Sequence, residues 1–567
     1  MKTFLLAAVL TLLLSTSAAH AADSTMIPHL ETRGRATQLI VDGRPWLILG
    51  GELNNTAATD AAYLEAAWPK LTRLALNTVL VAVAWDWIEP EEGKFDFSVL
   101  DGVLAGARKN RQKIVLLWFG SWKNGVSTFA PAWVKADQRR FPRVRVGSGS
   151  AIEVLSPFGE AALAADTRAY VALLEHLERV DAQHTTLMIQ LENEVGITGD
   201  SRDRSEGASR AFASQVPAEL LQWLQEHRTS LSPELLAAWQ AAGARSAGTW
   251  QQVFGTDLKA DEIFMAWRYA QYMGHIAAAG KAVYPLPVFT NSWLARADNV
   301  PGDYPSGGPE PLTFDIWKAG APAIDLNCPD ISVAGFDQIV RVFHRPDNPL
   351  FIPEGLGVAA GVANVFYAVG AQSGLGYSVF GIDNTVRLVM FPPVLGTAPP
   401  TDLESLPLAK GYAALRELTP MILEHQAQGT IDAAWLSAGK TSQEFDLGGY
   451  RLRFELRRTF WDQKFMTDLG YGIAMAAGPD EFYIVGADVQ VTFQPRTPGP
   501  SIAGLAVDEA GHFAGMHFVA ERKLNGDDIM LNYKLAQQAQ VNQSGSGARF
   551  GPEGPTIQHI KLYRYSP

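Results

Sequence analysis

The sequence predicts an α/β protein, a (β/α)8 TIM barrel followed by a C-terminal antiparallel β-sandwich domain. The chain has 567 residues, which is long for one compact domain. Between residues 27 and 428, short apolar runs alternate with amphipathic stretches, the pattern of a parallel sheet covered by helices. Over residues 430–567 the runs become alternating or β-branched and are separated by Gly and Pro, which is typical of an antiparallel sandwich.

Eight strand-helix units can be counted in the first region, and eight units predict a closed barrel. They follow a hairpin whose Asp42-Gly43 turn separates two apolar runs. The expected strands are Trp46–Gly51, Thr78–Ala84, Ile114–Phe119, Thr186–Leu191, Pro287–Thr290, Ala323–Leu326, Leu350–Pro353 and Gly376–Phe380. The expected helices include Asp60–Leu76, Phe97–Lys109, Gly159–Val180, Phe336–Phe343, Val358–Ala371 and a closing helix, Asp402–Leu423.

The fourth unit is enlarged. Residues 196–209 are polar and contain Gly, and residues 217–280 are strongly helical, so we expect a helical insertion at about 197–280. A second irregular loop is expected over 295–311, where Pro and Gly are frequent. Loops that follow barrel strands shape the active-site face, so both segments are expected there.

The N-terminus has the pattern of a secretory signal peptide. Lys2 precedes the apolar run Phe4–Leu14, and small residues then lead to Ala19-His20-Ala21. This predicts a signal peptide over residues 1–21 and export to the periplasm or the extracellular space. The apolar run is well short of the ~20 residues that span a bilayer, and no later run is long enough, so we expect no membrane span.

Composition argues against several partners and cofactors. The formal net charge is −12 and there is no basic run, so nucleic acid is not an expected partner. Cys328 is the only cysteine, which excludes an intramolecular disulfide. The sequence has no His-Glu-x-x-His or clustered Cys and His spacing, so we expect no metal and no other cofactor. The absence of a Gly-x-Ser-x-Gly run argues against the usual serine hydrolase.

Two apolar strands end in glutamates. The period of a strand places Gln190, Glu192 and Glu194 on one face at the end of the fourth strand. The seventh strand delivers Glu354 in the same way. Strands four and seven face each other across a barrel mouth, where two carboxyls can straddle one glycosidic bond. For Glu192, a structural ion-pair cluster and a role at the site are both open.

The run Gln-Leu-Glu-Asn-Glu-Val-Gly at residues 190–196 is similar to the Gln-x-Glu-Asn-Glu-x-Gly motif of glycoside hydrolase family 35, the β-galactosidases. The likeness extends from Gly-Gly-Glu-Leu-Asn-Asn at residues 50–55, through Trp-Asp-Trp-Ile-Glu-Pro at residues 85–90, to Glu354. It looks closest to a bacterial subgroup with a C-terminal β-domain, some of whose members remove galactose from xyloglucan side chains. The resemblance implies a retaining exo-β-galactosidase that acts on oligosaccharides by double displacement.

Carried over onto this sequence, the family pattern makes Glu194 the general acid/base and Glu354 the nucleophile. Asn193 would bind the sugar 2-hydroxyl, a contact that strengthens in the transition state. The chain departs from the pattern at Ala82 and Ser121, where a Tyr and a sugar-binding Glu are usual. The sugar pocket therefore differs, and a retaining exo-β-glycosidase for another terminal sugar is an alternative.

Further binding residues are expected at strand ends. Tryptophans fall there, and Trp85 and Trp122 are the preferred candidates for stacking on a sugar, with core packing as the alternative. Glu52 and Asn291 end the first and fifth strands and are expected hydroxyl ligands. A catalytically silent glycan-binding protein is the remaining alternative, and the presence of both Glu194 and Glu354 favours the enzyme.

Overall fold

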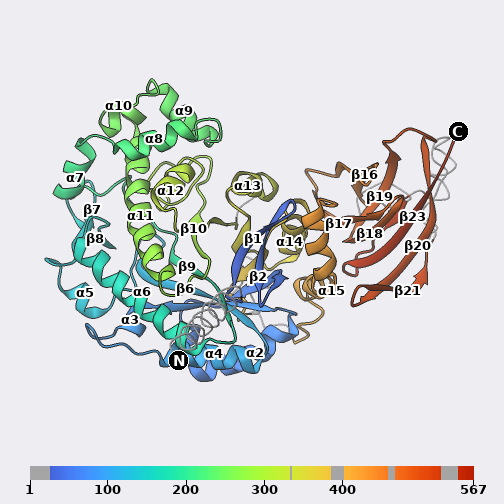
Figure 1. The fold of residues 1–567 in the computed structure, drawn as a ribbon, viewed down its shortest axis with the longest axis horizontal. Helices are drawn as coiled ribbons and strands as arrows, with labels where there is room; N and C mark the ends of the chain where they lie inside the picture. The colour runs from blue at the N-terminus through green and yellow to red at the C-terminus, as the bar shows by residue number, and fades with distance from the viewer. Residues whose placement is uncertain (1–25, 333–334, 385–400, 458–466, 525–546) are drawn as a thin grey trace, which may run out of the picture. The chain divides into compact units, whose positions relative to one another are not determined.

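The computed structural model describes residues 26–332, 335–384, 401–457, 467–524 and 547–567 (Figure 1). The expected signal peptide, residues 1–21, lies outside them. None of the helices in the described ranges is long and apolar enough to cross a bilayer. The chain folds as two compact units. Of the described residues, unit 1 comprises 26–31, Leu39–Trp46 and Val81–Asn327, and unit 2 comprises Thr32–Gln38, Leu47–Leu80 and those from Cys328 onward.

Eight strands form the barrel sheet, hydrogen-bonded in the order β11-β10-β9-β6-β5-β4-β13-β12. Neighbouring strands pair in parallel wherever a register is defined. The two ends of this order, β11 and β12, are joined by a parallel bridge between Ile331 and Gly355. The predicted barrel is confirmed. Its strands are β4 (Ile48–Glu52), β5 (Thr78–Ala84), β6 (Lys113–Lys123), β9 (Thr186–Asn193), β10 (Val288–Trp293), β11 (Leu326–Asp330), β12 (Phe351–Gly355) and β13 (Gly376–Phe380).

Helices follow the strands as the alternation predicts. They include α2 (Ala61–Arg73), α4 (Ser98–Lys109), α6 (Glu160–Val180), α13 (Phe336–Phe343), α14 (Ala359–Ala371) and the closing helix α15 (Pro407–Gln428). Helix α15 ends at Gly429, whose φ of 69° is the left-handed conformation that commonly stops a helix. The expected N-terminal hairpin is also present as β2 (Ala36–Val41) and β3 (Arg44–Trp46), with β1 (His29–Arg33) added at the edge of β2.

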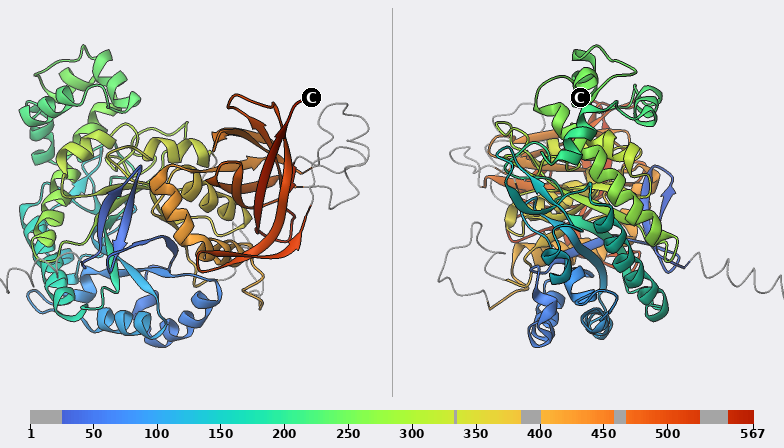
Figure 2. Two further views of the ribbon diagram at one scale, coloured as in Figure 1. Left: turned by 45° about the vertical axis from the view of Figure 1, so that its right-hand side comes forward. Right: turned by 90° about the vertical axis from the view of Figure 1, so that its left-hand side faces the viewer.

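The helical insertion in unit 1 follows β9. It consists of α7 (Glu206–Ala213), α8 (Ala218–Glu226), α9 (Pro233–Ala241), α10 (Trp250–Phe254) and the long α11 (Leu258–Lys281). Helices α8, α9 and α10 gather at one end of α11 (Figure 2). Helix α12 (Phe314–Gly320) follows the irregular loop after β10. Four short elements of unit 1 were not predicted: α3 (Trp85–Ile88), α5 (Ala132–Ala136), β7 (Arg143–Arg145) and β8 (Ala151–Leu155).

The sixth barrel strand lies later in the chain than predicted. The expected strand Ala323–Leu326 ends where β11 begins, at Leu326. Ile324 N donates to Ala321 O, which makes the residues before β11 a turn. The strand itself contains Asn, Pro and Asp, which are rare in strands and predict a loop, so the sequence placed it too early.

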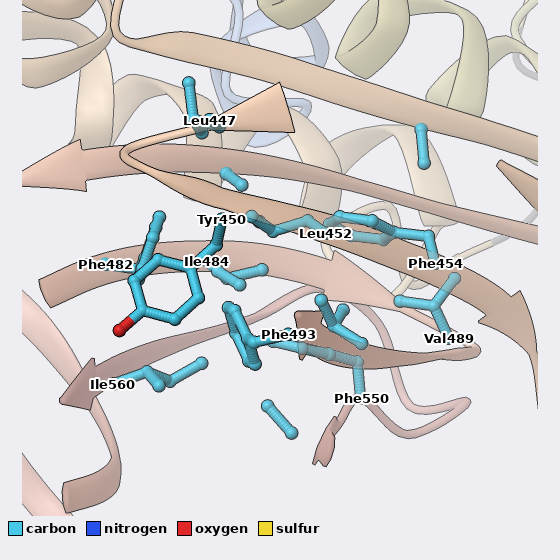
Figure 3. Packing of buried hydrophobic residues seen from close by; sticks show 14 of the residues in the cluster. Leu447, Tyr450, Leu452, Phe454, Phe482, Ile484, Val489, Phe493, Phe550 and Ile560 are labelled. Carbon is cyan, nitrogen blue, oxygen red and sulfur yellow. The ribbon is translucent and has the colours of Figure 1, made fainter. Parts of the chain in front are cut away.

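The C-terminal part of unit 2 is a β-sandwich, as predicted. One sheet has the order β14-β17-β18-β23-β20-β21 and the other β15-β16-β19-β22. Buried side chains from both sheets form one core, which includes Leu452 and Phe454 of β16 and Ile484 of β18 (Figure 3). The strands are β14 (Ile431–Ser437), β15 (Ser442–Leu447), β16 (Tyr450–Leu456), β17 (Leu469–Gly478), β18 (Glu481–Ala487), β19 (Val489–Pro495), β20 (Ile502–Ala514), β21 (His517–Lys523), β22 (Gly547–Arg549) and β23 (Thr556–Tyr565).

Within unit 2, helix α14 packs directly against the six-stranded sheet. A Cβ added at Gly370 would lie 2.6 Å from the Cβ of Ala433, so the helix and β14 are too close for a larger residue there. The ring of Phe366 packs edge-on against Tyr471, with 4.7 Å between centroids. Helix α14 therefore packs both on the barrel and on one sheet of the sandwich.

Candidate active site

The end of strand β9 carries the predicted acid/base in a strained backbone. Glu192 and Glu194 have φ angles of 61° and 45°, in the left-handed region that residues other than Gly rarely adopt. Glu192 is fully buried and Glu194 is 8% exposed. Strain of this kind persists only where surrounding contacts impose it, and it gathers at functional sites.

Two asparagines of unit 1 bond to Glu194, and a third, Asn193, bonds to one of them. The backbone N of Glu194 donates to Asn291 Oδ1 at 2.9 Å, and its carboxylate accepts a hydrogen bond from Asn124 Nδ2. Asn193 Oδ1 accepts from Gln190 Nε2 at 3.0 Å and from Asn291 Nδ2 at 3.2 Å. The structure therefore brings the predicted residues Asn193, Glu194 and Asn291 together, with Asn291 bound to protein groups through both atoms of its amide.

Asn124 was missed by the sequence analysis. It follows β6, and its backbone N donates to Asn193 O at 3.0 Å, so that it continues the pairing of β6 with β9. Asn124 has a φ of 56° and is followed by Gly125 with a φ of 62°. An Asn-Gly pair after an apolar strand is a turn signal, and it could have pointed to this position.

Glu52 and Glu354 lie in unit 2, each at the end of its own barrel strand. Glu354 is in β12, and its carbonyl accepts from Ile331 N at 2.8 Å. Glu52 is the last residue of β4, is fully buried, and accepts from Ile382 N at 2.9 Å through its carbonyl. Asp330, the last residue of β11, is 8% exposed and was missed because that strand was placed too early.

The two preferred tryptophans are buried inside unit 1. Trp85 is fully buried and donates from Nε1 to Glu89 Oε2 at 2.9 Å. Trp122 is fully buried and donates from Nε1 to Leu155 O at 2.8 Å, with Tyr272 packed edge-on against its ring. Neither ring has a free face, so the expectation that they stack on a sugar finds no support. Trp293, at the end of β10, is 46% exposed.

The side-chain carboxyl of Glu192, a residue of β9, lies in a bulge of the neighbouring strand β6. The register runs from Trp118 paired with Leu191 to Lys123 paired with Asn193, so β6 has extra residues between these points. The backbone N–H groups of the bulge turn to the Glu192 carboxyl instead of to a strand carbonyl. They are Gly120 N at 3.1 Å, Ser121 N at 2.8 Å and Trp122 N at 2.9 Å.

A second buried acid, Asp166 of α6, lies close to the Glu192 carboxyl, since a Cβ added at Gly120 would lie 2.7 Å from Glu192 Oε1 and 3.0 Å from Asp166 Oδ1. Asp166 also accepts from Ser121 Oγ at 2.6 Å and from Trp118 Nε1 at 3.0 Å. Burial raises the pKa of both carboxyls, and the Asp166 charge raises the pKa of Glu192 further. Asp166 lies among Ala and Leu residues on the buried face of α6, and a lone acid on an apolar stripe was the sequence signal for it.

The loop after β10 carries a further buried acid, Glu310. Ile197 and Ser306 exchange backbone hydrogen bonds of 3.1 and 3.0 Å, which fix this loop against the segment that follows Glu194. Glu310 is 4% exposed. Burial first and then the charge of Glu262 raise the pKa of Glu310 well above its usual range, and the charge of Glu194 contributes in the same direction. The irregular loop predicted over 295–311 therefore leads into the site of unit 1.

Comparison with known proteins gives matches in both parts of the chain. A glycoside hydrolase family 42 model described as β-galactosidase matches residues 58–254, and a domain of unknown function, DUF5597, matches residues 408–535. The chain is 36% identical over 105 residues to a β-galactosidase of Xanthomonas manihotis, which covers 18% of this chain and 17% of that protein. It is 41% identical over 58 residues to an exo-β-D-glucosaminidase of Thermococcus kodakarensis, which covers 10% of this chain and 7% of that protein.

These matches relate the chain to β-galactosidases. The homology supports a glycoside hydrolase, and family 42 is the family indicated. The assignment to family 35 is not confirmed. Among solved structures, a β-galactosidase from Bacillus circulans is 15% identical with a TM-score of 0.44, and covers 67% of this chain and 57% of its own. A mutant of a GH42 β-galactosidase from G. stearothermophilus is 14% identical with a TM-score of 0.44, and covers 66% of this chain and 57% of its own.

Proposed function

We propose that the protein is a retaining exo-β-galactosidase that releases terminal β-linked galactose from oligosaccharides, with xyloglucan side chains as one source. Glu194 is the general acid/base and Glu354 is the nucleophile. The observation that carries the proposal is Glu194 itself, a nearly buried glutamate in a left-handed conformation at the end of a barrel strand.

The contacts of Glu194 suit a proton-transfer group. Asn124 orients its carboxyl, and Asn291 fixes its backbone, so the side chain has little freedom to leave a productive position. In the first step, Glu194 gives a proton to the leaving oxygen as the bond from that oxygen to the anomeric carbon breaks. In the second step, it takes a proton from the water that attacks the same carbon.

Glu354 supplies the nucleophile in this scheme. Both glutamates end strands of one barrel sheet, and the carboxyl ends of barrel strands open on the same face. A carboxylate oxygen of Glu354 bonds to the anomeric carbon in the first step and leaves it in the second, which preserves the anomeric configuration. Retention requires the two carboxyls to stand ~5–5.5 Å apart.

Galactose is the favoured sugar because the matching family model and the Xanthomonas manihotis relative are both described as β-galactosidases. A second terminal sugar is favoured by one structural observation. Ser121, which stands where a sugar-binding Glu is usual, donates its hydroxyl to Asp166 on α6 and is fully buried. Compared with the family 35 pattern, the chain therefore lacks one ligand for a sugar hydroxyl. For this reason β-glucosides and β-glucosaminides should be tested as substrates beside the β-galactosides.

The proposal includes export, which rests on the signal-peptide pattern of residues 1–21. The expected cellular compartment is the periplasm or the extracellular space. Fractionation of the native host, with the mature N-terminus sequenced, tests this part separately from the chemistry.

The chemistry is tested by hydrolysis of nitrophenyl β-galactoside and a panel of galactosylated oligosaccharides that includes xyloglucan fragments. We expect release of β-galactose as the first product seen by NMR. Glu354→Gly should be inactive and should form α-galactosyl azide when azide is added. Glu194→Gln should lower kcat about 10³-fold on substrates with poor leaving groups, because proton transfer contributes ~10²–10⁴-fold.

Two results would contradict the proposal in different ways. An α-galactose first product would mean inversion, so Glu354 would not be a nucleophile. Sugar binding without hydrolysis of any β-glycoside in the panel would instead indicate a glycan-binding protein.

A further inference from the structure

The buried acids behind Glu194 are not used by the mechanism above. Glu192 and Asp166 are both fully buried, and burial, together with the charge of Asp166, raises the pKa of Glu192. A Cβ added at Gly120 would lie 2.7 Å from Glu192 Oε1 and 3.0 Å from Asp166 Oδ1, so both carboxyls crowd the same point of the β6 bulge. Two carboxylates that both lie this close to one point repel each other strongly inside a protein.

The groups that surround the pair are neutral donors. Glu192 receives the three backbone N–H groups of the bulge, and Asp166 receives the Ser121 hydroxyl and the Trp118 indole N–H. Tyr272 of α11 lies 3.1 Å from Ser121 Oγ through its own hydroxyl, and burial raises the pKa of Tyr272 well above its usual range, so it stays neutral.

Three basic side chains on the packed elements have other partners. These are Arg168 of α6 by Glu89, Arg268 of α11 by Pro157 O, and Lys123 of β6 over the ring of Phe119. Within the described residues, no ion pair reaches either acid of the pair. Removing the second negative charge therefore requires a proton, as in other pairs of carboxyls that share one site.

The pair is connected to Glu194 through the backbone. Glu192 closes the β6 bulge, and beyond the bulge β6 resumes its pairing with β9 at Lys123 and Asn193. The next residue, Asn124, donates from its backbone to Asn193 O and from its side chain to Glu194. The shape of the bulge thus determines where Asn124 stands and how it orients the Glu194 carboxyl.

We propose that Asp166 and Glu192 share one proton, and that this proton-sharing pair is a positioning device that holds the β6 bulge and, through Asn124, the Glu194 carboxyl. The inference rests on the proposed role of Glu194. At alkaline pH the pair loses its proton, the two charges repel, the bulge relaxes and kcat falls. Asp166 and Glu192 are positioning residues, since neither touches the substrate.

The test compares Asp166→Asn with Asp166→Ala. An Asn at position 166 can accept from Trp118 through Oδ1 and donate from Nδ2 to the Glu192 carboxylate, while the Ser121 hydroxyl turns to donate to Tyr272 OH. It therefore imitates the protonated pair without a titrating proton. On a dinitrophenyl galactoside, whose leaving group needs no proton from Glu194, we expect Asp166→Asn to keep kcat within about 10-fold at neutral pH and to lose the alkaline decrease of the wild type. Asp166→Ala should lower kcat about 10–100-fold with little change in KM, as expected for a misplaced catalytic group.

Asp181→Asn is the matched control. Asp181 is a buried acid just before β9, the strand that carries Glu192, and it accepts from Thr185 N and Thr186 N. It should leave the pH profile of kcat unchanged. The proposal is overturned if Asp166→Asn keeps the wild-type alkaline decrease, or if Asp166→Ala keeps wild-type kcat.

If the variants at position 166 do not fold, infrared spectroscopy of the wild-type protein tests the proposal instead. The infrared band of a protonated carboxylic acid should disappear with rising pH in step with kcat, and a band that does not follow kcat overturns the pair. Failure here leaves the proposed function standing when Glu354→Gly still forms α-galactosyl azide from nitrophenyl β-galactoside and added azide, with release of nitrophenolate. If that reaction fails as well, the proposed function fails independently of the pair.

Discussion

The two ends of strand β9 satisfy buried acids in opposite ways. Before the strand starts, Asp181 accepts from Thr185 N and Thr186 N at 2.9 and 2.7 Å and forms an ion pair with Arg108 at 2.7 Å. At its end, Glu192 also accepts backbone N–H groups, but its charged neighbour is a second acid, Asp166. At the start of the strand, the cation Arg108 compensates the negative charge of Asp181. At its end, in our proposal, a shared proton removes one of the two negative charges. In that proposal, the arrangement at Glu192 responds to alkaline pH.

The largest effect on stability is expected at the start of the strand. Asp181→Ala leaves two buried backbone N–H groups without an acceptor and removes the anion beside Arg108, which should cost about 3–4 kcal/mol of unfolding free energy. Urea unfolding measures the loss, and the pH profile of kcat should stay that of the wild type. A changed profile would show that the two ends of the strand are not separate in function.

Glu262 extends the comparison to a third buried acid. It is 1% exposed and accepts from Tyr304 OH at 2.7 Å, and burial raises its pKa from 4.5 to about 7. Because the folded state holds this proton more tightly, its stabilisation is complete below about pH 4.5 and disappears as pH rises to about 7, a change of about 3 kcal/mol. Glu262→Gln should remove that slope in urea unfolding measured across this range. Parallel curves for variant and wild type would contradict the shift.

The smallest of the three effects is expected at Asn291. Asn291→Ala removes the acceptor of Glu194 N and the donor to Asn193, so the left-handed conformation loses its anchor. We expect kcat to fall about 10–100-fold, equivalent to about 2 kcal/mol, with a smaller change in KM. Ser292→Ala is the control, because the Ser292 hydroxyl bonds to no described residue. Equal activity of the two variants would mean that the backbone of Glu194 needs no anchor.

Strand and helix periodicity predicted most of the fold. Strands Thr78–Ala84 and Gly376–Phe380 and helix Phe336–Phe343 have the predicted bounds, because each is a short apolar or amphipathic run between clear breaks. Strand β11 was misplaced because Asn, Pro and Asp within it resemble a loop. Tertiary pairing with the neighbouring barrel strands overrides that local preference.

Less of the site could be predicted. Glu194 and Asn291 followed from strand ends, since a barrel places those ends on one face, and Asn193 followed from the family resemblance. The bulge in β6 could not be predicted, because it depends on a carboxyl from another strand that replaces the missing backbone partners. The same limit explains the tryptophans: the sequence places Trp122 at a strand end, and only packing shows that it turns toward Tyr272.

The close packing of α14 on the sandwich has a consequence for how the chain can be shortened. A truncation after α15 would uncover Phe366 and leave Asn364 without the indole N–H of Trp435, which it accepts at 3.0 Å. The exposed helix face would be apolar and prone to aggregation. The C-terminal domain, about the last 140 residues, thus covers the apolar face of helix α14. Expression of the barrel by itself should therefore give insoluble protein.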